Sequence, residues 1–487
     1  MSVPLDQIPA PHDAAQLTLV DQLVQWGRRR IDERVFRPGM RMPSIRKLAL
    51  DKGVSRFTVV EAYERLVAHG YLDSRRGSGF YVRERIAPTL VAKGDAPAVA
   101  AEREPVQNTI DVVWLLRNML HTSSPEKGPG LGYLPGRWLD GELITNALRS
   151  LSRQSGAQML GFGTPQGFLP LRQQLQTRLE ELEIGASAAR QIVLVSGITQ
   201  AIDLISRLYV KPGDAVIVGD PAWFQMFGRF ASQGARLVGM PYTPDGPDLD
   251  ALETLVATWR PKMLIINSVL QNPTGTSLTA AQAFRILQLA QEYDFIVVED
   301  DVYGDLCPAG FPATRLASLD QLKRVIFLGS FSKTLAANLR VGYIAAAPEV
   351  AKALADQKML VGMTSPEINE RVVYKVLTEG HYRRHVERLR ARLDGVREKT
   401  ARMLEKTGFR LFATPAAGMF LWADAGVDSD GLAAAGHEAG FLLTPGSLFS
   451  PHQSPTTWMR FNIANCGDPA LPALLASYLE KAARRSA

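Results

Sequence analysis

Short apolar runs alternate with helix-like stretches from about residue 190 onward, and this alternation constrains the fold more than any other feature. The runs read QIVLVSG, DAVIVGD, RLVGMPY, KMLIINS, FIVVED, VIFLGS and VGYIAAA. Stretches with helical periodicity, such as TQAIDLISRLYV and TAAQAFRILQLAQEY, lie between them. Continuous apolar strands joined by helices predict a mostly parallel sheet that is covered by helices on both faces.

Residues able to bind a cofactor lie at or shortly after the ends of these strands. In chain order they are Gly197, Ile198, Thr199, Trp223, Asn272, Asp300, Tyr303, Ser330, Lys333 and Arg340. Singly, each has a plainer interpretation: a structural turn, a core tryptophan, a solvated charge, or a carboxylate that binds a metal. Their order at successive strand ends indicates one shared site, because ligands bind beyond the carboxyl ends of parallel strands.

The chemistry of this set matches the needs of pyridoxal phosphate. The cofactor requires a lysine for its Schiff base and an acid beside its pyridine nitrogen, so that the ring accepts electrons. It also requires donors to its phenolic oxygen, an aromatic face, and an anion pocket with an arginine. Lys333 in SFSK suits the first role, because burial near another cation lowers the pKa of a lysine. The sequence therefore predicts a pyridoxal 5'-phosphate site and no metal site.

Over roughly residues 110–487 the chain resembles the fold-type I aminotransferases of the class I/II family. The resemblance implies an α/β large domain with a mostly parallel sheet and a smaller α+β domain. It also implies that Lys333 forms the Schiff base and that Asp300 pairs with the pyridinium nitrogen. Tyr303 and Asn272 are implied to hold the phenolic oxygen, and Trp223 to stack on the ring. Lys333, Asp300 and Tyr303 are the implied catalytic residues.

The same resemblance implies partners for the phosphate and for a ligand carboxylate. The implied phosphate-binding residues are Gly197, Ile198, Thr199, Ser330 and Arg340. The run MRFNIA matches the motif whose arginine binds the substrate carboxylate, which implies this role for Arg460; a strand-end salt bridge is the alternative. In LGFGTPQGFLPLR the family usually has a tyrosine that reaches the neighbouring subunit's cofactor, where this chain has Phe162 without a hydroxyl. The region still implies a homodimer with sites at the interface.

Positive charge is concentrated at the N-terminal end of the chain. Residues 1–85 contain 15 Lys and Arg against 10 Asp and Glu, whereas the other 402 residues contain 40 against 39. This short part therefore holds nearly all of the net charge of +6. The asymmetry indicates a polyanionic partner, although a solvated basic surface would explain the charge taken alone.

The N-terminal part also has the element order of a winged helix-turn-helix. Apolar spacing from Leu19 to Ile31 predicts a first helix, and PSIRKLALDKG predicts a second with Pro43 in its first turn. Ser55 is a good N-cap for a third helix that ends at Gly70. The run YLDSRRGSGFYV then predicts two strands around a tight turn, which form the wing.

The run GMRMPSIRKLALDKGVSRFTVVEAYERLVAHGYLDSRRGSGFYV resembles the GntR-family DNA-binding domain over its full length. In a winged helix-turn-helix the start of the third helix meets base edges and phosphates, and the wing lies over the backbone or minor groove. The expected DNA-binding residues are Arg46, Ser55, Arg56, Phe57, Thr58, Arg75, Arg76, Gly77 and Gly79. A winged helix that contacts protein instead of DNA is the alternative.

Composition and motifs together give a domain plan. We expect a DNA-binding domain over 1–84, a linker rich in Ala and Pro over 85–108, and an aminotransferase-like body over 109–487. Within the body we expect a large domain at about 160–365. The small domain is expected at about 366–487, together with the body's N-terminal segment. Cys307 and Cys466 form no disulfide or metal pattern. No apolar run has membrane length and no export signal is present, so we expect a cytoplasmic protein.

A GntR-type winged helix, a linker and an aminotransferase-like body together resemble the MocR/GabR family of transcriptional regulators. The resemblance implies operator DNA as one partner, an amino compound or B6 vitamer as another, and a homodimer of head-to-tail type. The alternative is a catalytically active aminotransferase with an appended DNA-binding domain, because the residues of the half-reaction are present. A third hypothesis, a body that serves only for dimerisation, is disfavoured by the intact Lys333, Asp300, Tyr303 and Arg340.

Overall fold

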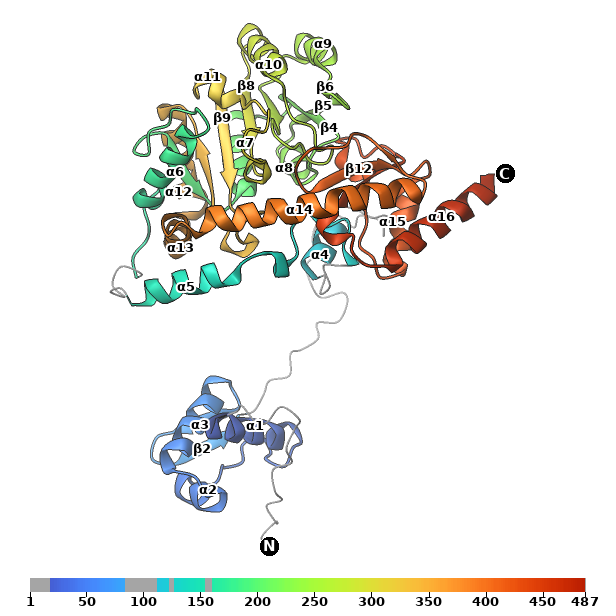
Figure 1. Ribbon diagram of the computed structural model, residues 1–487. Coiled ribbons are helices and arrows are strands. Elements are labelled where there is room, and N and C mark those ends of the chain that lie inside the picture. The colour runs from blue at the N-terminus through green and yellow to red at the C-terminus, as the bar shows by residue number, and fades with distance from the viewer. Residues whose placement is uncertain (1–17, 84–111, 122–126, 154–159, 487) are drawn as a thin grey trace. The chain divides into compact units, whose positions relative to one another are not determined.

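The computed structural model describes residues 18–83, 112–121, 127–153 and 160–486. Contacts between residues divide the chain into two compact units, Met1–Val106 and Gln107–Ala487 (Figure 1). The predicted linker at 85–108 lies outside the described residues, and the predicted domain boundaries stay predictions.

The N-terminal unit consists of three helices followed by a two-stranded wing. The elements are α1 (Leu19–Asp32), α2 (Ile45–Lys52), α3 (Arg56–Ala68), β1 (Leu72–Arg75) and β2 (Gly79–Val82). The two strands pair antiparallel, with Leu72 opposite Val82 and Arg75 opposite Gly79. This order confirms the predicted winged helix-turn-helix.

Local chemistry explains where these helices begin and how closely they pack. Ser44 caps α2, since its side chain accepts from the Lys47 N–H at 3.2 Å. Pro43 therefore precedes the cap, and the prediction that placed it in the first helical turn was wrong. Gly27 of α1 lies against Leu66 of α3, where an added Cβ would come within 2.7 Å of a leucine methyl group. A side chain at Gly27 would therefore require the Leu66 side chain to move.

The second unit is built on an eight-stranded sheet in the order β3-β10-β9-β8-β7-β4-β5-β6. Its strands are β3 (Ile192–Val195), β4 (Ala215–Asp220), β5 (Arg236–Thr243), β6 (Gly246–Pro247), β7 (Met263–Ile266), β8 (Ile296–Asp300), β9 (Val325–Ser330) and β10 (Gly342–Ala345). The strand pairs from β5 through β4, β7 and β8 to β9 are parallel. β10 is antiparallel to both neighbours because the short connection from β9 holds no crossover helix.

Helices cover both faces of this sheet, as predicted. One face carries α7 (Ile198–Tyr209), α8 (Gln225–Ala231) and α12 (Pro348–Gly362), and the other carries α6 (Leu169–Glu180), α9 (Leu249–Trp259), α10 (Ala280–Glu292) and α11 (Leu316–Asp320). Successive residues of β4 alternate between the two cores: Val216 and Val218 pack with the α7 side, and Ala215 and Ile217 with the α6 side. This alternation explains why the strand is apolar throughout.

A smaller, antiparallel sheet with the order β11-β12-β14-β13 completes the body. The remaining elements are β11 (Arg410–Leu411), β12 (Phe420–Asp424), β13 (Thr444–Pro445), β14 (Trp458–Asn462), α4 (Val112–His121), α5 (Gly141–Ser152), α13 (Glu367–Thr378), α14 (His381–Lys406), α15 (Ser429–Glu438) and α16 (Ala470–Ser486). The long helix α14 extends from α13 toward the small sheet (Figure 1). In the part of the chain that the structure describes, no helix is both long and apolar enough to span a bilayer.

Candidate functional sites

The carboxyl ends of the parallel strands bring the predicted cofactor residues to one cavity. Asp300 is the last residue of β8 and Ser330 the last of β9, while Trp223 follows β4. The cavity is lined by Ile198, Thr199, Trp223, Gln225, Asn267, Asn272, Asp300, Val302, Tyr303, Ser330, Ser332, Lys333 and Arg340. Of the predicted set, Gly197 alone is not part of this lining, and it lies directly behind Arg340.

The reversed direction of β10 brings Arg340 to the end of β3. Gly342 pairs with Val195 of β3 and with Ser330 of β9, so the residue two positions before it lies beside both strand ends. Arg340 Nη2 donates to the Ser196 carbonyl at 3.0 Å. Gly197 has φ +83°, and a Cβ there would come within 2.5 Å of Arg340 Nη2. The Arg340 guanidinium therefore occupies space that the Cβ of any residue other than glycine would fill at position 197.

The same corner of the cavity can bind an anion. Ile198 and Thr199 are the first residues of α7, where backbone N–H groups have no partner within the helix. Ser330 and Ser332 add hydroxyl groups, and Arg340 Nη1 lies 3.4 Å from Ser332 Oγ. These helix N–H groups, hydroxyls and a guanidinium converge on one small volume, which suits a phosphate.

Lys333 lies in the turn after β9 and its ammonium group borders the cavity. Nζ donates to the backbone carbonyl of Gly132 at 2.6 Å, and it lies 6.0 Å from the centre of the Tyr303 ring. Burial lowers the pKa of Lys333 to about 8, and the positive charges of Arg460 and Arg340 contribute to this shift. More of this lysine is therefore neutral near pH 7 than of an exposed one, as a nucleophilic amine requires.

Asp300 is the carboxylate that faces the cavity. Burial raises the pKa of Asp300 to about 7, and hydrogen bonds from Asn267 and the Val302 N–H oppose part of this rise. Asn267 also donates to the backbone carbonyl of Asp300 at 2.7 Å. A cationic ring nitrogen beside this carboxyl would lower its pKa and keep it ionised.

Tyr303, Asn272 and Arg460 form a buried chain across the cavity wall. Asn272 Nδ2 lies 3.2 Å from the Tyr303 hydroxyl, and Asn272 Oδ1 accepts from Arg460 Nη1 at 3.0 Å. The oxygen must face the arginine, because a guanidinium has no acceptor, so the amide nitrogen faces the tyrosine. This arrangement leaves the phenolic proton of Tyr303 available for a ligand oxygen.

Arg460 on β14 is a buried cation that has no carboxylate partner among the described residues. Nη2 donates to the Gly130 carbonyl at 2.6 Å, and the guanidinium lies 4.5 Å from the Phe420 ring and 4.9 Å from the Phe449 ring. Its Nε is buried without a hydrogen-bond partner. Burial lowers the pKa of Arg460 to about 10. A buried charge of this kind is costly unless an anion pairs with it.

These features fit pyridoxal phosphate. The N–H groups at the start of α7 have no partner within the helix, and the buried Arg460 Nε has no hydrogen-bond partner, so each can donate to an anion. The lack of a Cβ at Gly197 leaves room for the Arg340 guanidinium beside the start of α7. A phosphate dianion and a ligand carboxylate would balance the charges of Lys333, Arg340 and Arg460. The roles assigned to individual residues stay predictions.

The two carboxylates beside Asp300 have structural partners instead of a metal. Glu299 accepts from the N–H groups of Leu316 and Ala317, each at 2.8 Å. Asp301 pairs with Arg315 at 2.8 Å. The described residues contain no cluster of His, Cys, Asp and Glu able to hold a metal ion.

Sequence reasoning missed several residues of the cavity. Asn267 directly follows β7, so its place at a strand end was a usable signal. Gly130 and Gly132 act through backbone carbonyls that bond Arg460 and Lys333. No side-chain pattern in a sequence identifies a backbone carbonyl as an acceptor. Each of these two hydrogen bonds also joins residues about 200 positions apart or more.

The predicted DNA-binding residues lie on α2, at the start of α3 and on the wing. Ser55 caps α3: its Oγ accepts from the Thr58 N–H at 3.0 Å and lies 2.7 Å from Thr58 Oγ1. These two hydroxyls therefore support the helix start. Arg56 and Phe57 follow in the first turn and are exposed, Phe57 by 76%.

The arginines of this face carry charge that no carboxylate in the described part of the chain neutralises through an ion pair. Arg46, Arg56, Arg75 and Arg76 are exposed, and none forms an ion pair with a carboxylate of the described residues. Elsewhere in the unit Arg65 pairs with both Asp21 and Glu61. Arg75 lies 4.4 Å from the centre of the Tyr81 ring.

Two glycines shape the wing turn. Gly77 and Gly79 have φ of +75° and +104°, which favour glycine, and the Ser78 N–H donates to the Arg75 carbonyl at 2.9 Å. They are thus needed for the turn, whatever the wing contacts.

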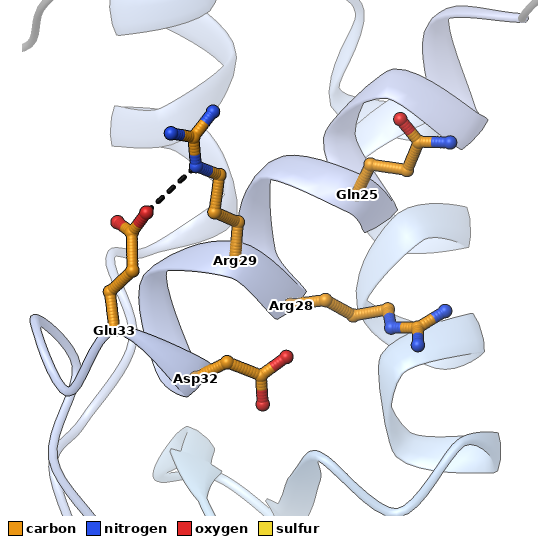
Figure 2. A pocket seen from close by; sticks show the side chains of 5 residues that line it. All are labelled: Gln25, Arg28, Arg29, Asp32 and Glu33. Atoms are coloured by element: carbon orange, nitrogen blue, oxygen red, sulfur yellow. Dashed lines mark hydrogen bonds and ion pairs between the residues drawn. The ribbon is translucent and has the colours of Figure 1, made fainter.

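A hollow beside α1 is a further feature of this unit. Figure 2 shows its lining, which comes from α1 and its C-cap residue: Gln25, Arg28, Arg29, Asp32 and Glu33. Arg29 Nε pairs with Glu33 at 2.7 Å, and Arg28 Nε donates to the Tyr71 hydroxyl at 3.1 Å. Because these charges already have partners, we assign no ligand to it.

Family models match both units. Residues 137–477 match aminotransferase class I and II, and residues 19–82 match the bacterial regulatory proteins of the gntR family. The chain belongs to the aminotransferase class I and II family. Within this family, the fusion to a GntR-type domain makes it a protein of the MocR/GabR type, which confirms the resemblance seen in the sequence.

The relatives of this chain include both transcriptional regulators and aminotransferases. The uncharacterized HTH-type transcriptional regulator YdfD of Bacillus subtilis is 29% identical over 412 residues, which are 82% of this chain and 83% of that protein. The 2-aminoadipate transaminase of Thermus thermophilus is 31% identical over 340 residues, 66% of this chain and 81% of the enzyme. The kynurenine aminotransferase of Pyrococcus horikoshii, solved with PMP, has a TM-score of 0.72 at 26% identity and covers 80% of this chain and 98% of its own. Class I/II aminotransferases of this fold depend on pyridoxal phosphate.

Proposed function

We propose that this protein is a transcriptional regulator that binds operator DNA through its winged helix and senses an amino compound or B6 vitamer with pyridoxal 5'-phosphate at Lys333. One observation carries the proposal: a GntR-type domain with exposed arginines is joined to a body whose cavity is lined by Lys333 and Arg340, neither of which forms an ion pair with a carboxylate of the described residues. The relation to YdfD and to NorG of Staphylococcus aureus, both named HTH-type transcriptional regulators, supports it.

Bound pyridoxal phosphate would supply an aldehyde that condenses with amines and a ring that withdraws electrons from the bound amine. The residues that would hold its phosphate are Gly197, Ile198, Thr199, Ser330 and Arg340. Asp300 would hold the proton of the ring nitrogen, and Tyr303 with Asn272 would bond the phenolic oxygen. Trp223 would cover one ring face, and the Lys333 amine would provide the point of covalent attachment and accept or return a proton at Nζ.

Arg460 would recognise a carboxylate on the effector. Its buried Nε lacks a partner, so a carboxylate in the cavity would complete its hydrogen bonds and offset its burial. Amines that carry a carboxylate should therefore bind more tightly than simple amines of the same size.

Regulation requires that the effector contacts two conformations of the body differently. The segment from Lys127 to Tyr133 is the candidate for this difference, because its carbonyls at Gly130 and Gly132 bond Arg460 and Lys333. A ligand carboxylate on Arg460 and a covalent bond on Lys333 would change both contacts.

The functional form would be a homodimer of head-to-tail type. Leu160, Phe162 and Leu360 are exposed by 88%, 83% and 84%. A Cβ added at Gly163, next to Phe162, would come within 3.1 Å of Glu367, which places this segment beside the start of α13. Apolar side chains exposed on this scale are suited to a second copy of the chain. Phe162 would contribute packing there and no hydrogen bond to a phosphate.

The second candidate function is aminotransferase catalysis. The complete set of cavity residues and the relation to the 2-aminoadipate transaminase of Thermus thermophilus favour it. Sustained turnover of amino acids with a keto acid at ordinary rates would make catalysis the primary role.

The experiment combines spectra of the bound cofactor with operator binding. A DNA fragment that the protein binds is first selected from a random pool. The full-length protein is then titrated with a panel of amino acids, amines and B6 vitamers. A compound that changes the absorbance of the bound cofactor should also change the affinity of the protein for this DNA fragment. Arg56→Ala should abolish DNA binding and leave the spectrum unchanged. A spectral change that never alters DNA binding would overturn the regulatory proposal, and unaltered binding by Arg56→Ala would remove α3 as the recognition helix.

A further inference from the structure

The turn that carries Lys333 is bonded to α14 through the next residue, Thr334. His385 Nε2 lies 2.8 Å from the Thr334 carbonyl oxygen, and the Tyr382 hydroxyl lies 2.6 Å from Thr334 Oγ1. Tyr382 and His385 are three positions apart on α14, so they project from one face of the helix. All three residues are buried. One residue is therefore held at both its backbone and its side chain.

The direction of each hydrogen bond follows from its acceptor. A carbonyl oxygen can only accept, so His385 carries its proton on Nε2. Burial lowers the pKa of His385, which favours this neutral form. The Tyr382 hydroxyl donates to Asp305 Oδ2 at 2.5 Å, which uses its single proton. The Thr334 hydroxyl must therefore donate to Tyr382, and no group at this contact is left unsatisfied.

The network is anchored at its far end as well. Asp305 Oδ1 pairs with Arg178 of α6 at 2.7 Å, and the Asp305 carbonyl accepts from Arg390 of α14 at 2.9 Å. The Arg178 guanidinium also lies 5.2 Å from the centre of the Tyr382 ring. Asp305 follows Tyr303 by two residues. The same network thus connects the turns of Lys333 and Tyr303, and it is buried at Thr334, Tyr382 and His385, where satisfied hydrogen bonds make it stiff.

We infer that Tyr382 and His385 are positioning residues for Lys333: by fixing Thr334 they direct the Lys333 amine into the cavity. The inference rests on the proposed function, since it concerns a lysine that reacts with a cofactor. Thr334 points to α14 while Lys333, its neighbour, reaches the cavity and the Gly132 carbonyl. A lysine side chain has four rotatable methylene groups and holds its amine in place only when its backbone is fixed.

The test compares three variants of the full-length protein stripped of cofactor. His385→Leu removes the donor to Thr334, His385→Gln keeps an N–H donor on a side chain of similar reach, and Tyr382→Phe removes one oxygen atom. Pyridoxal phosphate is added, and covalent attachment is followed by absorbance and by mass after borohydride reduction, across a range of pH. Misplacement of a reacting group lowers rates steeply, so we expect His385→Leu to load about tenfold or more slowly than wild type. His385→Gln should recover most of the rate.

The pH profile separates positioning from general loss of structure. The midpoint of the loading rate reports the Lys333 pKa, which depends on where the amine lies relative to Arg460 and Arg340. It should shift in His385→Leu and Tyr382→Phe and stay in place in His385→Gln. Thr400→Val, at another buried position of α14, is the control that should change neither rate nor midpoint.

Two failures are distinguishable. Wild-type protein that never forms the covalent product would overturn the proposed function itself. Wild-type protein that loads normally, with folded His385→Leu or Tyr382→Phe that match its rate and midpoint, would overturn the positioning role alone. If His385→Leu does not fold, Tyr382→Phe decides the question.

Discussion

Lys333, which is partly buried, and Lys358, which is fully buried, are two lysines of the same body with different surroundings. Burial lowers the pKa of each to about 8. Lys358 is 0% exposed, and its Nζ donates to the carbonyls of Leu194 and Pro165 at 2.7 and 3.1 Å. Glu370 adds a nearby negative charge that favours the ammonium form of Lys358. Lys333 instead borders a cavity, and the positive charges of Arg460 and Arg340 lower its pKa further, while Asp300 opposes them.

The difference shows that a lowered pKa does not by itself locate chemistry. Two hydrogen bonds hold the Lys358 amine to backbone carbonyls and its side chain is fully buried, so it joins the loop before α6 to β3 and α12. Lys333 combines the same pKa with access to a cavity that an anion and an aldehyde can enter. Access and neighbouring charge therefore distinguish a reactive lysine from a structural one.

The largest expected effect is on covalent attachment of the cofactor. Lys333→Ala should lose the borohydride-stable mass increase completely, because no other amine reaches the cavity among the described residues. Lys358→Met should keep it, since its lysine is enclosed. Intact-mass measurement after reduction checks both variants. Retention of the covalent product in Lys333→Ala would contradict the assignment of Lys333.

The second effect is on stability, which Lys358→Met should lower more than Lys333→Ala. Lys358→Met takes the donor away from the carbonyls of Leu194 and Pro165 and removes a positive charge that acts on the buried Glu370. Leaving a buried polar group unsatisfied costs about 1 to 3 kcal/mol. Lys333→Ala removes a partly buried cation beside Arg460 and Arg340, whose repulsion Asp300 offsets only in part, so the stability of the body should stay the same or rise. Thermal unfolding of the two cofactor-free variants measures the difference.

A matched control uses the partner of Lys358. The double variant Lys358→Met with Glu370→Gln should recover part of the lost stability, because it removes both charges. Equal destabilisation by Lys333→Ala and Lys358→Met would remove the distinction between a reactive and a structural lysine.

Much of the body could be predicted from the sequence. The apolar runs identified the strands of the large sheet, since a strand buried on both faces has no polar positions. Because ligands bind at the carboxyl ends of parallel strands, the sequence alone predicts that Asp300, Ser330 and Lys333 share one site. In the N-terminal unit the cap at Ser55 and the turn at Gly77 were readable, because each depends on local backbone chemistry.

Contacts between distant segments could not be predicted in the same way. The bond from Lys333 to Gly132 depends on a backbone carbonyl, and that from Thr334 to His385 joins a turn to a helix 51 positions away. Lys358 shares the buried side of α12 with Ala351, Leu354 and Ala355. This spacing was a usable signal, but a lysine in a helix is ordinarily exposed.

The third effect is a dependence on pH. The neutral amine is the nucleophile, so the rate at which cofactor-free protein forms the covalent product should rise as pH increases through about 8, the pKa of Lys333, and then level off. Below this pH the ammonium form has no lone pair. Stopped-flow absorbance from pH 6 to about 10 measures the profile. A midpoint near the ordinary value of 10.5 would show that burial does not act on this amine as described.

The smallest effect concerns the arginine that helps to set this pKa. Arg460 is the largest charge contribution to the lowered pKa of Lys333, after burial itself. Arg460→Met should therefore move the midpoint of the loading rate upward, to a value between about 8 and 10.5, while attachment still occurs. The same variant should leave the stability difference between Lys333→Ala and Lys358→Met unchanged, because Glu370 and Arg172, not Arg460, are the charges that act on Lys358. A midpoint that stays in place would mean that burial alone sets the reactivity of Lys333, and access to the cavity would then be the whole difference between the two lysines.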